Sequence, residues 1–140
     1  MKILLAYDGS SHADKAMERA AMIAGKFDAA LTVISVTPDL CLPSTELSLE
    51  ECENVTAAYS REAEGGLRKV ADALSVKGIT VNRVIASGQT VDKILETAES
   101  MGAELIVLGS RGRQGAKRLF LGSVSSEVAE HAKCDVLIVK

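Results

Sequence analysis

Short apolar runs that alternate with segments of helical spacing constrain the fold of this chain more than any other feature. The first run, residues 3–7, is unbroken and ends at Asp8-Gly9-Ser10. Unbroken runs of this length are typical of strands covered on both faces, as in a parallel sheet, whereas an interrupted run suits an edge strand. The other runs are residues 31–36, 105–108 and 136–139, with a more interrupted one at 81–86.

The segments between the runs carry apolar residues three and four positions apart, which predicts helices. Residues 48–51 (SLEE) match a capping box at the start of one helix, and Gly78 stands where that helix ends. Strands that alternate with helices predict an α/β fold, a doubly wound five-stranded parallel sheet with helices on both faces. Sheets of this kind bind ligands beyond the carboxyl ends of their strands.

The second helix is expected to be the longest and to keep one apolar face. Gly65 and Gly66 each weaken it by roughly 1 kcal/mol, so a kink or a close neighbour is expected there. Both prolines, Pro38 and Pro43, precede the helix, so residues 37–47 form the one substantial irregular connection. The apolar positions of this helix are Val55, Ala58, Tyr59, Ala63, Leu67, Val70, Ala71 and Leu74.

Composition restricts the class of protein. A chain of 140 residues without a long spacer is expected to form one domain, residues 1–140. A net charge of −3, with two Tyr, two Phe and no Trp, argues against nucleic-acid binding. No stretch approaches the roughly 18 apolar residues of a membrane span, and none resembles a signal peptide. We therefore expect a cytoplasmic protein with no membrane partner.

The three cysteines, Cys41, Cys52 and Cys134, follow no metal-binding or disulfide pattern, because their number is odd and CxxC spacing is absent. We expect three reduced thiols and no zinc site.

A glycine motif follows the fourth apolar run. Gly109 and Gly112 are separated by two residues, and nine more residues lead to Gly122 and Ser123, which open the last helix. Glycines let the backbone approach a ligand closely, and free N–H groups at a helix start attract anions, so this pattern predicts a phosphate cradle. Chance would produce roughly 0.01 matches to this pattern in such a chain.

The simpler alternative is that these glycines serve only as turn and helix-start residues. The loop between them also contains Arg111, Arg113, Lys117 and Arg118. These side chains either neutralise phosphate charge or form a solvated basic surface.

Asp8 ends the first run and would face the Gly109 loop if the first and fourth strands are neighbours. There it would bind a ribose hydroxyl or hold Mg²⁺. The alternative role is to cap the first helix, which Ser10 or Ser11 would perform equally well.

Other functional motifs are absent from the sequence. It contains no GxGxxG, no GxxxxGK[ST] and no GxSxG, so dinucleotide-binding, P-loop and serine-hydrolase interpretations have no support. His12 and His131 fall near helix ends and suggest no catalytic triad.

The whole chain resembles the universal stress protein family, in particular its ATP-binding branch. The resemblance rests on residues 2–10 (KILLAYDGS), 31–36 (LTVISV), 106–112 (IVLGSRG), 121–124 (LGSV) and 134–139 (CDVLIV). The Gly-x2-Gly-x9-Gly-[Ser/Thr] motif that marks the nucleotide-binding members of the family is intact here.

This resemblance implies a strand order of 3-2-1-4-5 and a homodimer formed through the last strand. It implies that ATP and Mg²⁺ are the ligands, with Ala6 and Asp8 at the adenosine end and Val36 toward adenine. The glycine motif with Ser123 would surround ribose and phosphates. Weaker contacts are implied for Leu108, Arg111 and Val124.

The leading hypothesis is an ATP-binding regulatory protein of the stress response, whose nucleotide state biases a dimer or a partner surface. Because no positioned general base is evident, it would be at most a slow ATPase or autophosphorylating protein. Two alternatives are an enzyme that uses ATP to adenylate or phosphorylate a substrate, and a protein-interaction module with a vestigial cleft.

Overall fold

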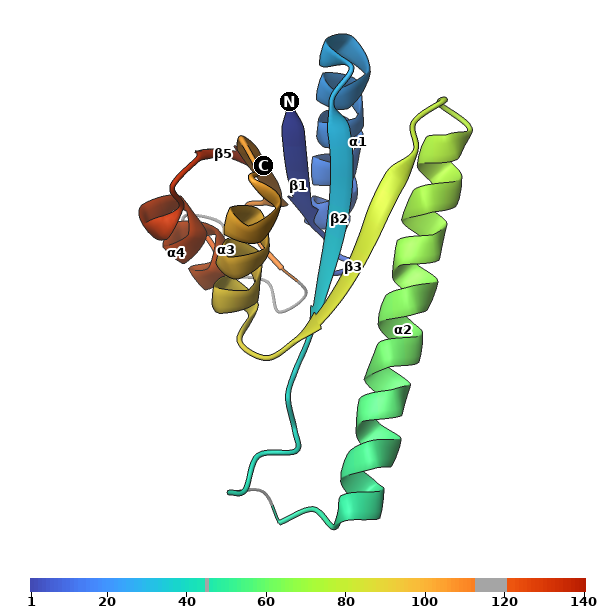
Figure 1. Ribbon diagram of the computed structural model, residues 1–140, viewed down its shortest axis with the longest axis vertical. Coiled ribbons are helices and arrows are strands. Elements are labelled where there is room, and N and C mark those ends of the chain that lie inside the picture. The colour runs from blue at the N-terminus through green and yellow to red at the C-terminus, as the bar shows by residue number, and fades with distance from the viewer. Residues whose placement is uncertain (45, 113–120) are drawn as a thin grey trace.

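The computed structural model describes residues 1–44, 46–112 and 121–140, which form a five-stranded sheet and four helices (Figure 1). The sheet order is β3-β2-β1-β4-β5, and every neighbouring pair is parallel. The predicted fold class and strand order are therefore confirmed. The strands are β1 (Lys2–Ala6), β2 (Ala30–Thr37), β3 (Val81–Ser87), β4 (Leu105–Gly109) and β5 (Asp135–Val139). The helices are α1 (Ser11–Phe27), α2 (Leu49–Ser75), α3 (Thr90–Met101) and α4 (Ser123–His131).

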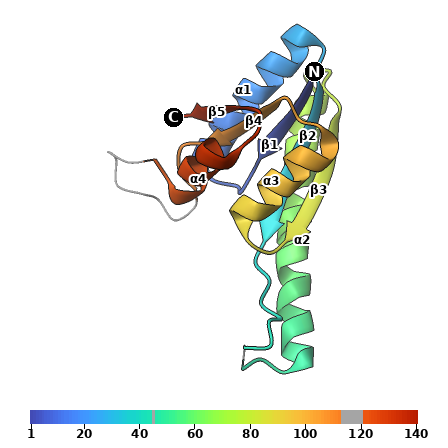
Figure 2. The same cartoon turned by 60° about the vertical axis from the view of Figure 1, so that its left-hand side comes forward.

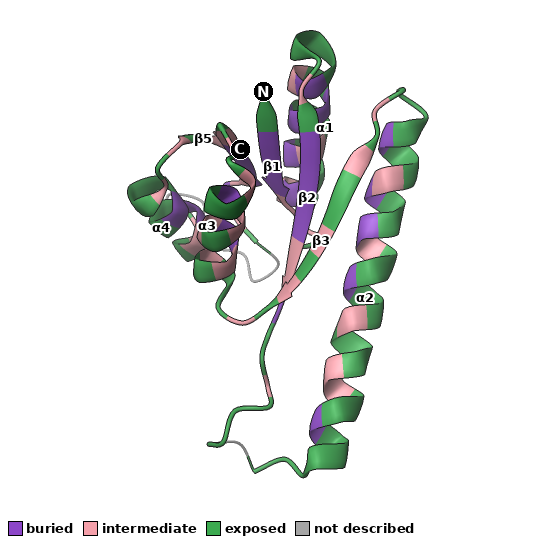
Figure 3. Cartoon of the chain, viewed as in Figure 1, coloured by how far each residue is buried: buried purple, intermediate pink, exposed green. Residues whose placement is uncertain are grey.

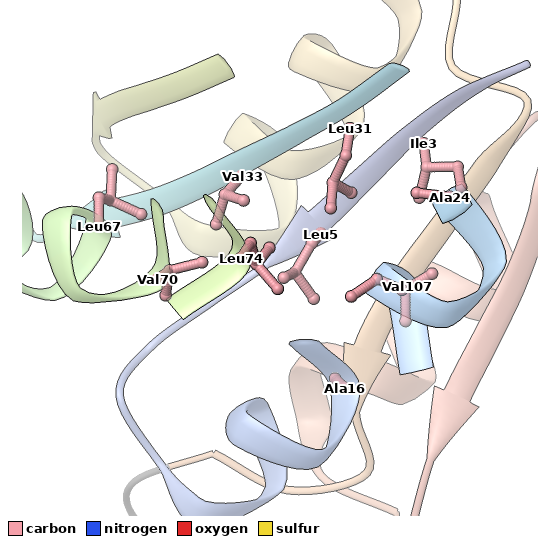
Figure 4. Close-up of a cluster of buried hydrophobic side chains, with 12 residues drawn as sticks. Ile3, Leu5, Ala16, Ala24, Leu31, Val33, Leu67, Val70, Leu74 and Val107 are labelled. Carbon is pink, nitrogen blue, oxygen red and sulfur yellow. The ribbon is translucent and has the colours of Figure 1, made fainter. Parts of the chain in front are cut away.

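Helices cover both faces of the sheet, as a second view makes clear (Figure 2). Alternate residues of one strand point to opposite faces, so Ile3 and Leu5 enter one core whereas Leu4 enters the other. The first core packs the sheet against α1 and α2 (Figure 4). The second packs it against α3 and α4. Full burial of such side chains contributes roughly 1.5–3 kcal/mol each to stability.

Serine side chains fix the starts of two helices. The Ser10 hydroxyl accepts a hydrogen bond from the Ala13 amide at 3.1 Å and caps α1. Ser48 and Glu51 form the predicted capping box at the start of α2.

Within the described residues, no helix is both long enough and apolar enough to cross a membrane.

The double glycine in α2 lies inside a continuous helix, and only Gly66 has a neighbour within 4 Å. A Cβ atom at Gly66 would lie 3.9 Å from Cε1 of the Tyr7 ring, which is ordinary van der Waals contact. Gly65 has open space around it. The Tyr7 ring therefore does not require a glycine at position 66.

Helix α2 is longer than the sheet on which it packs. Its 27 residues span roughly 40 Å, whereas the eight residues of β2 span roughly 26 Å. The N-terminal half of α2 and the preceding connection extend beyond the sheet, where most positions are exposed (Figure 3). We call residues 38–60, of which residue 45 lies outside the described residues, the arm.

This overhang corrects the predicted apolar face of α2. Ala63, Leu67, Val70 and Leu74 are buried as expected. Ala58 and Tyr59 are exposed, although Tyr59 lines a small pocket with Ser35, Val36 and Thr37 at the end of β2.

The expectation of three reduced thiols is wrong for two of them. Cys41 and Cys52 form a disulfide, and their Cα atoms are 5.5 Å apart, an ordinary separation for this bond. The pairing arises because residues 38–44 run back toward the first turn of α2, a tertiary contact that cysteine spacing does not encode. Cys134 is free.

Candidate nucleotide site

A cavity of about 480 Å³ opens at the carboxyl ends of β1, β2 and β4, where the sheet reverses its winding. This volume is typical of a small-molecule site. All ten residues that the sequence singles out line this cavity. They are Ala6, Asp8, Val36, Leu108, Gly109, Arg111, Gly112, Gly122, Ser123 and Val124. Residues Arg113, Lys117 and Arg118 of the same loop lie outside the described residues.

The three glycines of the motif have different neighbours. A Cβ at Gly109 would lie 2.8 Å from the backbone carbon of His12, so this glycine lets α1 pack against the end of β4. At Gly112 a Cβ would lie 2.8 Å from Oδ2 of Asp8. At Gly122 it would lie 3.2 Å from the carbonyl oxygen of Ser110. Packing of α1 thus accounts for Gly109, and Gly122 has the helix-start role of the simpler alternative, as the N-cap of α4. Gly112 keeps the loop backbone beside the Asp8 carboxylate.

Helix α4 begins at the cavity without a side-chain cap. Its N-cap residue is Gly122, and glycine has no side-chain acceptor for the first amides of the helix. The Ser125 hydroxyl points backward and donates to a carbonyl oxygen, with Ser110 at 3.1 Å and Gly122 at 3.0 Å as acceptors. No side chain of residues 1–44, 46–112 or 121–140 caps the positive end of the helix dipole, so its first N–H groups favour an anion at Ser123.

The cationic side chain of Arg111 belongs to the cavity lining, and its backbone lies near the start of α4. Its Nε is buried and has no hydrogen-bond partner among the described residues. A buried donor of a charged group without an acceptor is costly, so the geometry favours an incoming oxygen at this point. A phosphate supplies such an oxygen.

Asp8 lines the cavity and also orders the turn before α1. Its Oδ1 accepts a hydrogen bond from the Ser10 amide at 2.9 Å. Ser10, not Asp8, caps the helix, so the predicted alternative of Asp8 as the N-cap is wrong. Asp8 Oδ2 faces the Gly112 backbone, which places this carboxylate beside the glycine loop, as the sequence predicted.

Tyr7 lies beside Asp8 and donates its hydroxyl proton to Oδ1 of Asp14 at 2.7 Å. Burial, followed by this hydrogen bond and the charges of Asp14 and Asp8, raises the pKa of Tyr7 to about 12. The phenol therefore stays protonated at neutral pH and does not act as a base there.

A family model for the universal stress protein family matches residues 1–140. The chain belongs to this family. Universal stress protein MJ0531 of Methanocaldococcus jannaschii is 34% identical over 142 residues, which cover 99% of this chain and 81% of that protein.

Solved structures of universal stress proteins share its fold. UspA from Lactobacillus plantarum has a TM-score of 0.89 at 26% identity, with 100% of this chain and 97% of that chain covered. A universal stress protein in complex with cAMP has a TM-score of 0.76 at 26% identity, with coverage of 100% and 97%.

The cavity of this universal stress protein includes lining residues that sequence reasoning missed. Ile34 lies two positions before Val36 in β2, so the period of a strand would have placed both on the same face. Thr90 and Ile94 come from α3, whose approach to the site depends on helix packing. The other missed residues are Tyr7, Ala13 and Ser125.

Metal-binding potential is restricted. Within residues 1–44, 46–112 and 121–140, no group of three His, Cys, Asp or Glu side chains could enclose a metal ion. Asp8 is the one carboxylate among the described residues that line the cavity. A single carboxylate suits a cation that is mainly bound by phosphate oxygens and water, as Mg²⁺ is in many nucleotide sites.

Proposed function

We propose that this universal stress protein is a regulatory protein of the stress response that binds ATP in the cavity. The observation that carries the proposal is the start of α4, which no described side chain caps, together with the buried Nε of Arg111, which has no hydrogen-bond partner among the described residues. Both features favour an anion, and they lie at the same end of the cavity. The triphosphate would occupy this end, along Gly112, Gly122 and Ser123.

The opposite part of the cavity is apolar and suits a planar base. Ala6, Val36 and Leu108 come from the ends of three neighbouring strands and belong to the second core or pack against it. An apolar wall with a few polar groups is typical of sites for such ligands. The relative solved with cAMP supports an adenine nucleotide as the class of ligand.

Asp8 would contact the ribose or hold Mg²⁺ between the two parts of the site. Its carboxylate borders both the cavity and the Gly112 backbone, so a ligand that reaches from the strands to α4 passes beside it. Bound Mg²⁺ would neutralise phosphate charge, with phosphate oxygens as its other ligands.

Regulation, rather than rapid catalysis, fits the groups that line the cavity. Among the described lining residues there is no histidine, and the hydroxyl of Tyr7 is held protonated. The one carboxylate among them, Asp8, is assigned to the ribose or to Mg²⁺. Phosphoryl transfer to water requires a group that orients or deprotonates the nucleophile. We therefore propose that ATP is turned over slowly or not at all, in the cytoplasm.

We also propose a homodimer through β5. This strand forms one edge of the sheet, pairs with β4, and carries the apolar sequence VLIV after Asp135. An apolar edge strand is a template for pairing with another chain, and a second copy would satisfy it.

Two substitutions test the proposed ATP contacts in titrations with Mg-ATP, ATP with EDTA, and adenosine. Gly112→Val places bulk on the loop and displaces the Asp8 carboxylate, so Mg-ATP affinity should fall by at least about tenfold. Asp8→Ala should weaken adenosine and Mg-ATP equally if Asp8 binds ribose, and mainly Mg-ATP if it binds the metal. Ser11→Ala, a substitution at an exposed serine of α1, is the control.

Unchanged Mg-ATP affinity in Gly112→Val would exclude the glycine loop from the site. Unchanged affinity for all three ligand preparations in Asp8→Ala would exclude this residue from the ligand contacts.

A further inference from the structure

The apolar stripe of α2 does not end where the sheet ends. Buried positions 63, 67, 70 and 74 follow one another at spacings of three and four residues. The same spacing continues backward through Tyr59, Thr56, Cys52 and Leu49, which lie in the arm. Cys52 is covered by its disulfide partner, but Leu49 is 76% exposed and Tyr59 is 38% exposed.

The connection before α2 adds further apolar side chains to the arm. Leu42 is 51% exposed and Leu47 is 41% exposed. Large exposed side chains that continue a helical stripe are typical of surfaces that bind another protein.

The charge of the arm has one sign. Residues 27–60 contain no Lys, Arg or His. The acidic residues of the arm are Asp39, Glu46, Glu50, Glu51 and Glu53, and all five are exposed.

Local structure accounts for two of these five carboxylates. Asp39 accepts a hydrogen bond from the Cys41 amide at 3.1 Å, and Glu51 completes the capping box with Ser48. A third carboxylate, that of Glu50, lies in the first turn of α2 and interacts favourably with the helix dipole. Glu46 lies before the helix and Glu53 lies beyond its first turn, so neither dipole nor cap explains them.

The arm is held in one shape before any partner binds. The Cys41–Cys52 disulfide joins the connection to the helix, and Cys41 Sγ lies 3.3 Å from Oγ1 of Thr56 one turn further along. The capping box of Ser48 and Glu51 fixes the start of the helix between Cys41 and Cys52 in the sequence. A preformed surface loses less conformational entropy on binding than a flexible one does.

We propose that the arm is a docking surface for a basic, amphipathic segment of a partner protein. Lysine and arginine side chains would face Glu46, Glu50 and Glu53, while apolar side chains of the segment would cover Leu49 and Tyr59. Charge complementarity of this kind steers association and selects the partner. Contact between the arms of two copies would instead place the five carboxylates of one chain near the five of the other, and like charges repel.

Most of this surface lies apart from the cavity at the carboxyl ends of the strands, but Tyr59 lines a smaller pocket with Tyr7 and Asp8, which also line that cavity. The proposal does not depend on nucleotide binding. Glu46, Glu50, Leu49 and Glu53 do not line that cavity.

The test uses a fluorescein-labelled, 18-residue synthetic helix of lysine and leucine, with a glutamate–leucine helix of the same pattern as the control peptide. Binding to the full chain is followed by fluorescence anisotropy at physiological ionic strength. Glu46→Gln/Glu50→Gln/Glu53→Gln should weaken binding at least about tenfold. Leu49→Ser alone should weaken it severalfold.

A charge-matched variant controls for general attraction between a basic peptide and an acidic protein. Glu18→Gln/Glu127→Gln/Glu130→Gln changes three exposed carboxylates of α1 and α4, with the same change in net charge. Its affinity for the lysine–leucine helix should stay within about threefold of the unsubstituted protein. Circular dichroism establishes that each variant is folded.

Three results would overturn the proposal. They are equal affinity of the arm and control variants, equal binding of the glutamate–leucine helix, and self-association in sedimentation velocity that Leu49→Ser abolishes. The last result would assign the arm to contact between copies of this chain.

Discussion

The glycines of the motif have different structural roles, although they belong to one sequence pattern. Gly109 makes room for the backbone of α1, and Gly122 starts α4 beside the carbonyl oxygen of Ser110. Gly112 keeps the loop against the carboxylate of Asp8. A substitution at Gly109 therefore changes helix packing first, so Gly112 is the better position at which to test the proposed nucleotide contacts.

Arg111 is the residue whose substitution separates phosphate binding from base binding. Arg111→Met keeps much of the length of the side chain and removes the buried Nε–H donor. A hydrogen bond to a charged group contributes roughly 1.5–3 kcal/mol, so ATP affinity should fall about 10- to 100-fold. Adenosine affinity should stay unchanged, as measured by isothermal titration calorimetry. An equal loss for both ligands would mean that Arg111 supports the cavity as a whole.

Ser10 provides a test of the fold at one residue. Ser10→Ala removes the acceptor for the Ala13 amide and should lower the free energy of unfolding by about 1 kcal/mol. Urea denaturation measures this change. The neighbouring Ser11→Ala lies inside the helix and should have little effect, and similar losses for the two variants would contradict the assignment of the cap.

At the scale of elements, the strands were predictable because short, unbroken apolar runs between helical segments are typical of buried parallel strands. Residues 3–7, 31–36 and 105–108 correspond to β1, β2 and β4 to within a residue or two. The boundaries of α2 were equally clear from the capping box and Gly78. What sequence pattern could not predict was how much of α2 the sheet would cover, because that depends on the relative lengths of two elements.

The disulfide was missed for a related reason. Cys41 and Cys52 are 11 positions apart in a stretch without regular structure on one side. Only the tertiary path of residues 38–44 brings them together.

Reduction of the disulfide should loosen the arm and leave the sheet intact. By restricting the unfolded chain, a loop closed at this length stabilises the folded state by roughly 3 kcal/mol. No described side chain of the arm belongs to either core cluster beside the sheet. Hydrogen exchange with and without a thiol reductant should therefore show faster exchange in residues 49–58 and unchanged protection in β1, β2 and β4. Cys134→Ser should behave like the unsubstituted protein, and equal loss of protection throughout would contradict a local role.

At the scale of the whole molecule, topology gathers the site from distant parts of the sequence. β1 and β4 are neighbours in the sheet, so Asp8 meets a loop that follows it by about a hundred residues. This juxtaposition was predictable, because a switch point in a doubly wound sheet has a fixed place. The contributions of α3 were not, because they depend on how the helices pack over the sheet.

The most direct test of the account is to identify what the protein binds when it is purified. Freshly isolated protein is denatured, any released nucleotide is identified by mass, and the emptied protein is titrated with Mg-ATP. We expect recovered adenine nucleotide or saturable binding of one Mg-ATP per chain, with a slow rise of ADP at most. Absence of both would contradict a nucleotide site at the start of α4.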